Sequence, residues 1–542
     1  MLGKSSVEVR QGPQGANISF NGRLLYSASS TPEKRLRSLP EASEALYVLI
    51  SPLLFHGTNK LISMLPVGSD IIAVEHDPEI YRQTSDYHQS SALKEQDYIL
   101  VDSSSADMLA EYIIKLRCRK IITVKLNLGY MINRRFYDEL IQNTESFLSN
   151  FWKNRMTTIH MGRLWCRNII LNTPRISNAS FISNLKTDKP VISLGAGESL
   201  EENIPFIKKN RERFFLTAAD TAVTSLLLNG IRPDLVIALE SQHANLYDFY
   251  EDDSFDLPVA ADLTSSPELL RKLRGPLYFY ISEFDYSIIF KLLDNSGLLP
   301  PLLPPLGSVG ITSLLISLLL TDNWVLFSGL DFSFIPDKYH AQGAPSHIIS
   351  QLNESRLQKT GFFHSAYSVK RTKETDKSGR IVYTDLVMKS YAETLSRLIT
   401  DSGRTIDLGK YGLENPAPAY SEDQLFEILC SKPADGSELL NRNREMSKKP
   451  FCSPSDFLKT EAGKLERAIS EVVEFQNYRD EKSVLPEETL ILINELDYTW
   501  LFFPDKNPLP SSDSSFLRRF LFSASWFSSQ ISHASALINP QS

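Results

Sequence analysis

Two glycines and a serine form the first group of residues that could do chemistry. Gly195 and Gly197 follow the apolar run 190–194, and Ser199 opens an apolar-periodic stretch with acidic residues in its first turn. A strand, a glycine turn and a helix N-terminus form a recurring anion cradle, because free backbone N–H groups and the helix dipole favour negative charge. The glycines would let a phosphate approach the backbone, and Ser199 would either donate its hydroxyl or only cap the helix.

Two acidic residues follow the next apolar runs. Asp220 comes after the run 214–218, and Glu240 comes after the run 235–239. Open α/β sheets bind ligands at the carboxyl ends of their strands, so both carboxylates are predicted at that edge. Asp220 could instead only cap the helix that follows it. Two such acids beside a glycine turn predict a binding site.

A second small-residue turn stands at the start of a strongly apolar helix. Ser308 and Thr312 flank the beginning of this helix near Val309. They could contact a ligand, or they could be helix-start residues only. Carboxylates at the strand ends could engage Mg²⁺, but nothing in their spacing demands a metal, and we place none.

A strand-end aspartate and a histidine complete the candidate site. Asp331 follows the apolar run 324–327, where it could fix a turn or orient a hydroxyl of a sugar or base. His340 follows shortly afterwards and places a titratable base near the same edge. A surface role for His340, or a base at His364, is the alternative, and His243 and His347 are further candidates for the base.

The elements that must position these residues follow an α/β pattern. Asn21-Gly22 predicts a β-hairpin over residues 18–27. Apolar runs then alternate with helical spacing over residues 40–170, which indicates a parallel doubly wound sheet, and the pattern resumes near residue 190. From Ser421 the pattern is helical. We predict an α/β fold of two Rossmann-like doubly wound units followed by a helical C-terminal domain, with boundaries at 1–172, 173–420 and 421–542.

Glu75 ends the second predicted strand, where an acidic residue often binds a ribose hydroxyl. The loop before it, residues 52–58, has Gly57 as its one glycine, and bulky neighbours discourage close approach of a phosphate. We interpret Glu75 as a strand-end polar residue, with a ligand contact as the alternative. The first unit is then a degenerate methyltransferase-type domain that serves as a scaffold or a partner surface.

Composition narrows the class of protein. The chain has 542 residues and a formal net charge of -8, which argues against nucleic-acid binding. Its four cysteines form no CxxC pair, so we expect reduced thiols. No secretory signal is evident, and Asp322 and Asn323 interrupt the apolar stretch 309–330, so a buried helix, a turn and a buried strand are predicted there. We expect a soluble cytoplasmic protein that binds neither nucleic acid nor membrane.

Five sequence blocks carry a specific resemblance. In order they are GAGESLEENIPFIKKN, AADTAVTSLLLNGIRPDLVIALE, GSVGITSLLISLLL, LFSGLDFSF and KYHAQGA. Together they resemble the motility accessory factor family, which glycosylates flagellin with nonulosonic acids. The same core is similar to the archaeal 6-hydroxymethylpterin diphosphokinases and, more distantly, to bacterial CMP-sialic-acid sialyltransferases. The chain departs from the family at Glu198, which usually is Pro, and at Glu240, which usually is Asp. A carboxylate at Glu198 would repel a phosphate unless its side chain turned to solvent.

The resemblance implies a glycosyltransferase that moves a nonulosonic, sialic-acid-like sugar from a CMP-activated donor to Ser or Thr of flagellin. Asp331 and His340 would be catalytic, with His340 as the general base. The residues that would hold the nucleotide are Gly195, Gly197, Ser199, Asp220, Glu240, Ser308 and Thr312. The reaction would need no cofactor. An ATP-dependent 6-hydroxymethylpterin diphosphokinase-type transferase that uses Mg²⁺, and a non-catalytic flagellar export or binding factor, are the alternatives.

Overall fold

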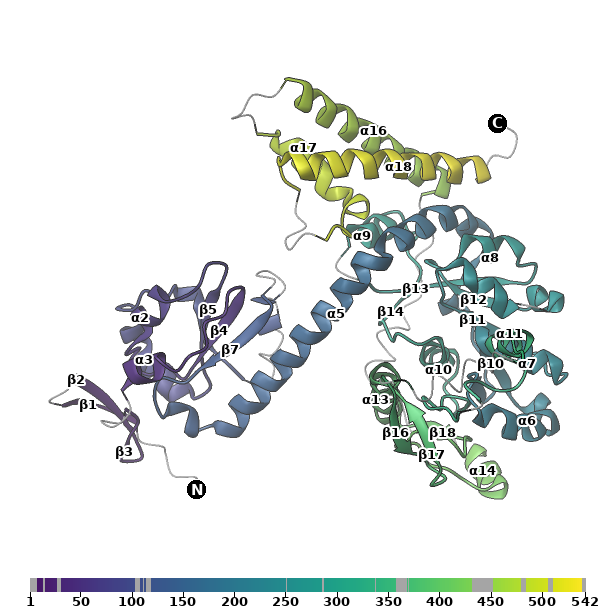
Figure 1. The fold of residues 1–542 in the computed structure, drawn as a ribbon, viewed down its shortest axis with the longest axis horizontal. Helices are drawn as coiled ribbons and strands as arrows, with labels where there is room; N and C mark the ends of the chain where they lie inside the picture. Colours follow the sequence, from purple (N-terminus) through teal and green to yellow (C-terminus); the bar gives the residue numbers. More distant parts are fainter. Residues whose placement is uncertain are drawn as a thin grey trace. The chain divides into compact units, whose positions relative to one another are not determined.

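The computed structural model describes residues 7–12, 15–26, 31–102, 108–110, 112–113, 118–249, 251–284, 287–336, 338–356, 368, 370–430, 452–478, 484–504 and 510–538. The chain forms two compact units. The first comprises Met1–Thr157 with Pro504–Pro508, and the second comprises Thr158–Phe503 with Leu509–Ser542. Figure 1 shows the helices and strands of both units, coloured along the sequence.

A small antiparallel sheet opens the first unit. Its strands lie in the order β1 (Val7–Gly12), β2 (Gly15–Phe20) and β3 (Arg23–Leu24). Asn21 and Gly22 join β2 to β3 with φ angles of 48° and 80°, as the tight turn of a hairpin requires. The predicted hairpin is therefore confirmed.

A four-stranded parallel sheet forms the core of the first unit. Its strand order is β6-β5-β4-β7, and the strands are β4 (Ala45–Ile50), β5 (Asp70–Glu75), β6 (Tyr98–Leu100) and β7 (Lys120–Val124). Helix α1 (Pro32–Leu36) precedes the first of these strands, whereas α2 (Thr58–Ser63) follows β4 and α3 (Pro78–His88) follows β5. All residues of β4 are buried, because the strand lies between β5 and β7 and is covered on both faces.

Glu75, at the end of β5, is buried and is bound by donors of the protein itself. Its carboxylate accepts the Ser51 hydroxyl at 2.6 Å and the Tyr137 hydroxyl at 2.9 Å. It also accepts the N–H groups of His76 and Asp77, at 2.9 and 3.0 Å. Burial raises the pKa of Glu75, and these donors oppose the shift. The contacts support the interpretation of Glu75 as a strand-end polar residue.

The second unit is built on a nine-stranded sheet whose pairings are all parallel. The strand order is β14-β13-β12-β11-β10-β9-β15-β18, with β8 also paired to β13. The strands are β8 (Ser180–Phe181), β9 (Val191–Leu194), β10 (Phe215–Ala219), β11 (Leu235–Ala238), β12 (Val259–Asp262), β13 (Leu277–Ser282), β14 (Leu302–Leu303), β15 (Val325–Ser328) and β18 (Thr405–Asp407). The mixed α/β class with parallel sheets agrees with the prediction.

Helices cover both faces of this sheet. On one face α10 (Val309–Leu320) and α13 (Leu386–Ser402) pack over side chains such as Ile237 and Phe327. On the other face three helices cover side chains such as Ile192 and Leu326. These helices are α6 (Ser199–Lys209), α7 (Val223–Leu228) and α14 (Glu422–Leu429).

The most apolar stretch of the chain forms α10 and then β15. Every residue of α10 after Val309 is buried, and a turn at Asp322 and Asn323 leads into the strand. The predicted helix, turn and strand are thus confirmed. In the part of the chain that the structure describes, no helix is long and apolar enough to cross a membrane.

The C-terminal helices belong to the same compact unit as the nine-stranded sheet. They are α16 (Pro454–Tyr478), α17 (Glu487–Glu495) and α18 (Ser514–Ile538). Helices α16 and α18 run side by side (Figure 1). One apolar cluster joins them to β12, to β13 and to the end of α5 (Arg134–Asn172). The helices therefore share a core with one part of the sheet.

Candidate functional site

The carboxyl ends of β9 and β15 lie next to each other where the strand order reverses. Leu194 is paired with Ser328, so two turns, Gly195–Gly197 and Gly329–Asp331, leave adjacent strand ends. The N–H of Gly195 donates to the Ser328 carbonyl at 2.8 Å, and the N–H of Gly197 donates to the Gly329 carbonyl at 2.9 Å. Open α/β sheets bind their ligands at such a switch point.

The glycines are required because these two turns pack very closely. A Cβ on Gly195 would lie 2.3 Å from the Gly329 carbonyl oxygen, and a Cβ on Gly197 would lie 2.6 Å from a carboxylate oxygen of Asp331. Gly329 has a φ of 77°, which favours glycine in its own right. The prediction explained Gly195 and Gly197 by the approach of a phosphate, whereas the structure places protein atoms there.

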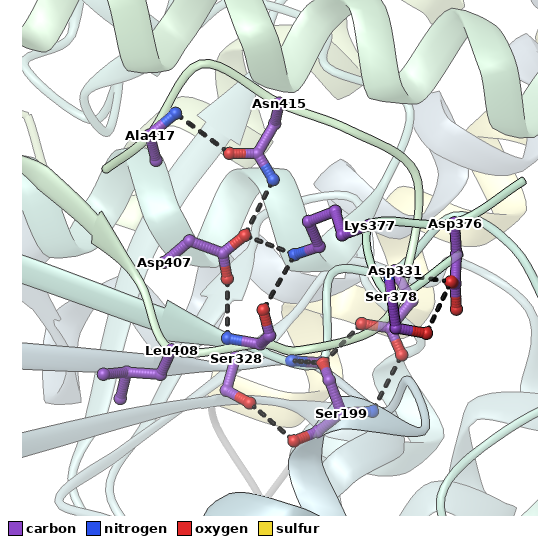
Figure 2. A network of polar contacts seen from close by, with 12 residues as sticks. Ser199, Ser328, Asp331, Asp376, Lys377, Ser378, Asp407, Leu408, Asn415 and Ala417 are labelled. Atoms are coloured by element: carbon purple, nitrogen blue, oxygen red, sulfur yellow. Dashed lines mark hydrogen bonds and ion pairs between the residues drawn. The ribbon is translucent and has the colours of Figure 1, made fainter. Parts of the chain in front are cut away.

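The carboxylate of Asp331 occupies the N-terminus of α6. It accepts the N–H of Ser199 at 2.8 Å, and its second oxygen accepts the Ser199 hydroxyl. Figure 2 shows these bonds between Ser199 and Asp331. The Ser199 oxygen in turn accepts the N–H of Gly329 at 2.9 Å. Burial raises the pKa of Asp331 to about 6, against the opposing effect of these donors. The anion at this helix start is therefore a side chain of the protein, in the position that the sequence assigned to a phosphate.

A lysine from a distant hairpin lies beside this cluster. The hairpin consists of β16 (Thr372–Thr375) and β17 (Ile381–Thr384), and Lys377 stands in its turn. Lys377 forms an ion pair with Asp407, at the end of β18, and donates to the Gly409 carbonyl at 3.0 Å (Figure 2). Asp407 also accepts Asn415 Nδ2 at 2.8 Å, so its carboxylate is held in place.

A second cation of the same turn pairs with Glu198. Arg380 Nη2 lies 3.0 Å from Glu198 Oε2, and the Arg380 guanidinium stacks over the Tyr411 ring with 3.4 Å to the ring centroid. Arg380 Nε also donates to Asp376 at 3.1 Å. From the sequence alone, a carboxylate at Glu198 is expected to repel a phosphate unless its side chain turns to solvent. It instead carries its own counter-ion.

The loop that carries His340 is attached to the glycine turn. The N–H of Ala341 donates to the Ala196 carbonyl at 2.7 Å. The Nδ1 atom of His340 lies 2.8 Å from Ser346 Oγ, and burial lowers the pKa of His340 to about 4. The imidazole is therefore neutral at neutral pH and able to accept a proton. The alternative base, His364, lies outside the described residues.

The remaining predicted nucleotide-binding residues form local hydrogen bonds. Asp220, which follows β10, is buried and accepts the N–H of the next residue at 2.8 Å. Glu240, which follows β11, is exposed and accepts an N–H two residues further on at 3.0 Å. The hydroxyl of Thr312 donates to the Ser308 carbonyl within α10 at 3.1 Å. These contacts are those of strand-end and helix-start residues.

Three acids that Mg²⁺ could engage stand on different strand ends. Asp220, Glu240 and Asp331 follow β10, β11 and β15 in turn. Among the described residues, no three His, Cys, Asp or Glu side chains are grouped so that they could hold a metal ion.

Sequence reasoning missed Lys377, Arg380 and Asp407. A local signal exists for the turn, because Ser378-Gly379 lies between two runs of β-prone residues, which is typical of a hairpin. Asp407 lies 30 positions from Lys377, and Glu198 lies 182 positions from Arg380, so no local spacing indicates these two pairs.

Comparisons with known proteins find similar sequences over part of this chain. Residues 167–337 match the family model described as 6-hydroxymethylpterin diphosphokinase MptE-like. The chain is 29% identical over 348 residues to an uncharacterized protein of Treponema pallidum (strain Nichols). The aligned residues cover 61% of this chain and 60% of that protein. A second uncharacterized protein of the same strain is 33% identical over 99 residues, or 17% of this chain and 44% of that protein. The matches span less than two thirds of these relatives.

A solved structure shares the fold over nearly the whole chain. The Maf glycosyltransferase from Magnetospirillum magneticum AMB-1 superimposes with a TM-score of 0.53 at 13% sequence identity. The match covers 98% of this chain and 87% of that chain. Together with the family match within the second unit, it confirms the resemblance that the five sequence blocks predicted.

Proposed function

We propose that this chain, which resembles the motility accessory factor family and carries an MptE-like core, is a glycosyltransferase. Its donor is a CMP-activated nonulosonic sugar, and its acceptor is a Ser or Thr hydroxyl of flagellin in the cytoplasm. Support comes from the fold shared with a glycosyltransferase and from the polar cluster at the switch point of the sheet.

The observation that carries the proposal is the pair of cations, Lys377 and Arg380, at the switch point. Each is held by a carboxylate from another element, and their side chains remain 22% and 33% exposed, so a ligand can reach them. Departure of CMP leaves negative charge on its phosphate, and cations fixed in advance stabilise such charge. Because Asp331 fills the start of α6, we assign the donor phosphate to these two cations.

The acceptor hydroxyl requires a base. In the proposed reaction the acceptor oxygen forms a bond to the anomeric carbon as the bond from that carbon to the CMP phosphate oxygen breaks. The hydroxyl proton passes to the neutral imidazole of His340, whose loop is attached to the glycine turn. Asp331 fixes Ser199 and the two turns that frame the site.

Two other functions remain candidates, each for a specific reason. The MptE-like match favours an ATP-dependent 6-hydroxymethylpterin diphosphokinase-type transferase, in which Mg²⁺ would help to hold the triphosphate. The carboxylate of Asp331 occupies the start of α6, where the sequence predicts a phosphate, and this favours a non-catalytic flagellar export or binding factor.

Replacement of Lys377 by methionine tests the site. Each charge-assisted hydrogen bond contributes about 1.5–3 kcal/mol, so Lys377→Met should weaken CMP binding roughly 10- to 150-fold in calorimetry. The matched control is Lys373→Met, which removes an exposed lysine on β16 and should leave the affinity unchanged. Asp407 keeps its bonds to Asn415 and Gly409, so the variant should fold.

The same titrations separate the three functions. CMP binding that EDTA does not change supports the glycosyltransferase. Binding of ATP only in the presence of Mg²⁺, with no binding of CMP, would contradict the glycosyltransferase and favour the diphosphokinase-type transferase. Failure of both nucleotides to bind at millimolar concentration would favour the non-catalytic factor.

A further inference from the structure

A small pocket of about 120 Å³ lies between the end of α5, the helix α8 (Pro267–Lys272) and α18. Helix α8 follows β12. In the sheet, β11 and β10 lie between β12 and β9, so the pocket is separate from the switch point. Three arginines line the pocket, together with one histidine and a single acid, and these residues are Arg167, Arg175, Arg271, His533 and Glu268. All of them belong to the second unit.

The single carboxylate does not balance the three guanidinium groups. Glu268 Oε1 lies 3.7 Å from Arg167 Nη2 and 3.5 Å from Arg271 Nη2, both longer than a good charge-assisted hydrogen bond. The other oxygen, Oε2, accepts the Ser266 hydroxyl at 3.0 Å. The lining therefore carries an excess of two positive charges even when the histidine is neutral.

Arg175 lines the same pocket and has no counter-ion among the residues that the structure describes. Arg271, which lines the pocket too, acts on it with a like charge. Its partial burial, together with the charge of Arg271, lowers the pKa of Arg175. A half-buried guanidinium beside a like charge is costly unless an anion neutralises it.

We propose that this pocket is a binding site for a small oxyanion, separate from the donor site. The planar guanidinium group matches the oxygens of phosphate and carboxylate in a bidentate manner, and three such groups converge here. Ligand pockets for whole organic molecules measure about 300–1,000 Å³, so this pocket suits one phosphate or carboxylate group and excludes a nucleotide.

The pocket is linked to the ends of the sheet strands through Arg167. Its Nη1 atom donates to Asn168 Oδ1 at 3.1 Å. The Nδ2 atom of Asn168 donates to the carbonyls of Ser241 and Thr264, at 3.0 and 2.8 Å, in the loops after β11 and β12. An anion bound to Arg167 is therefore one side chain away from the ligand edge of the sheet.

Titration with inorganic phosphate at constant ionic strength tests the site. In a phosphate-free buffer with chloride as the balancing salt, phosphate should raise the melting temperature of the second unit, and acetate in a parallel series measures the response to a carboxylate. Arg175→Gln and Arg271→Gln should each weaken the phosphate response at least tenfold. Arg397→Gln removes an exposed arginine on α13 and should leave the response as in the wild type.

The charge imbalance also predicts the direction in which the melting temperature changes. Without phosphate, Arg175→Gln should melt at the wild-type temperature or above it, because the change relieves repulsion from Arg271. CMP affinity should be unchanged in both pocket variants, so the result does not depend on the proposed donor site. Equal phosphate responses in the wild type and in both pocket variants would overturn the proposal and leave a general salt effect. Arg271 is exposed, so Arg271→Gln keeps the test valid if Arg175→Gln fails to fold.

Discussion

Replacement of Gly329 by alanine should destabilise the second unit by more than about 4 kcal/mol or prevent its folding. A Cβ at this position would lie 2.2 Å from the carbonyl oxygen of Gly195, a backbone atom that cannot turn away as the end of a flexible side chain can. Relief of the clash would require β9 and β15 to move apart, which breaks the pairing at the switch point. The φ of 77° adds about 1–2 kcal/mol of strain for a residue with a side chain.

Gly230→Ala is the matched control for this prediction. Gly230 also has a positive φ, 69°, but beyond its own chain neighbours no atom lies within 4 Å of a Cβ built there. The control should therefore lose only about 1–2 kcal/mol. Urea denaturation followed by circular dichroism compares the two variants in the transition of the second unit. Equal losses in both would show that the two turns are not packed as closely as described.

His340→Ala should lower turnover roughly 10²- to 10⁴-fold, since the acceptor hydroxyl would lose its base. Because burial lowers the pKa of His340 to about 4, the imidazole is neutral above that pH. The acid limb of the kcat/KM profile should consequently fall near pH 4, below the ordinary histidine range, and rates should be nearly constant from pH 5 to 7. Affinity for CMP should change little, since the phosphate is assigned to Lys377 and Arg380.

His243→Ala serves as the control for the base, because His243 is exposed and follows the end of β11. Steady-state rates of sugar transfer across the pH range provide the measurement. A near-native rate in His340→Ala, or an acid limb that persists in that variant, would assign the proton to another group.

Much of the fold was predictable because its signals are local. A buried parallel strand is covered on both faces and therefore reads as a short apolar run, as in Val191–Leu194 and Val325–Ser328. The hairpin turn at Asn21-Gly22 was equally local. The core shared by α16, α18 and β13 was not predictable, since an apolar helix face does not indicate which surface it will cover.

The candidate site was predictable in part for the same reason. The glycine turn and Asp331 follow strands that the sequence reveals, and the structure brings Gly197, Ser199 and Asp331 into contact. The sequence did not indicate that Asp331 itself would occupy the start of α6. Nor did it indicate the pairing of Glu198 with Arg380, since 182 positions separate the two residues.

The most direct test of the proposed function is the intact mass of flagellin after incubation with this protein and a CMP-activated nonulosonic sugar. The glycosyltransferase function predicts that the mass rises in steps of one sugar residue, with CMP released in equal amount and with EDTA making no difference. At donor concentrations below the dissociation constant, the steps should form at least tenfold more slowly with Lys377→Met than with Lys373→Met. Unchanged flagellin mass with the folded wild-type protein and an intact donor would contradict the proposal.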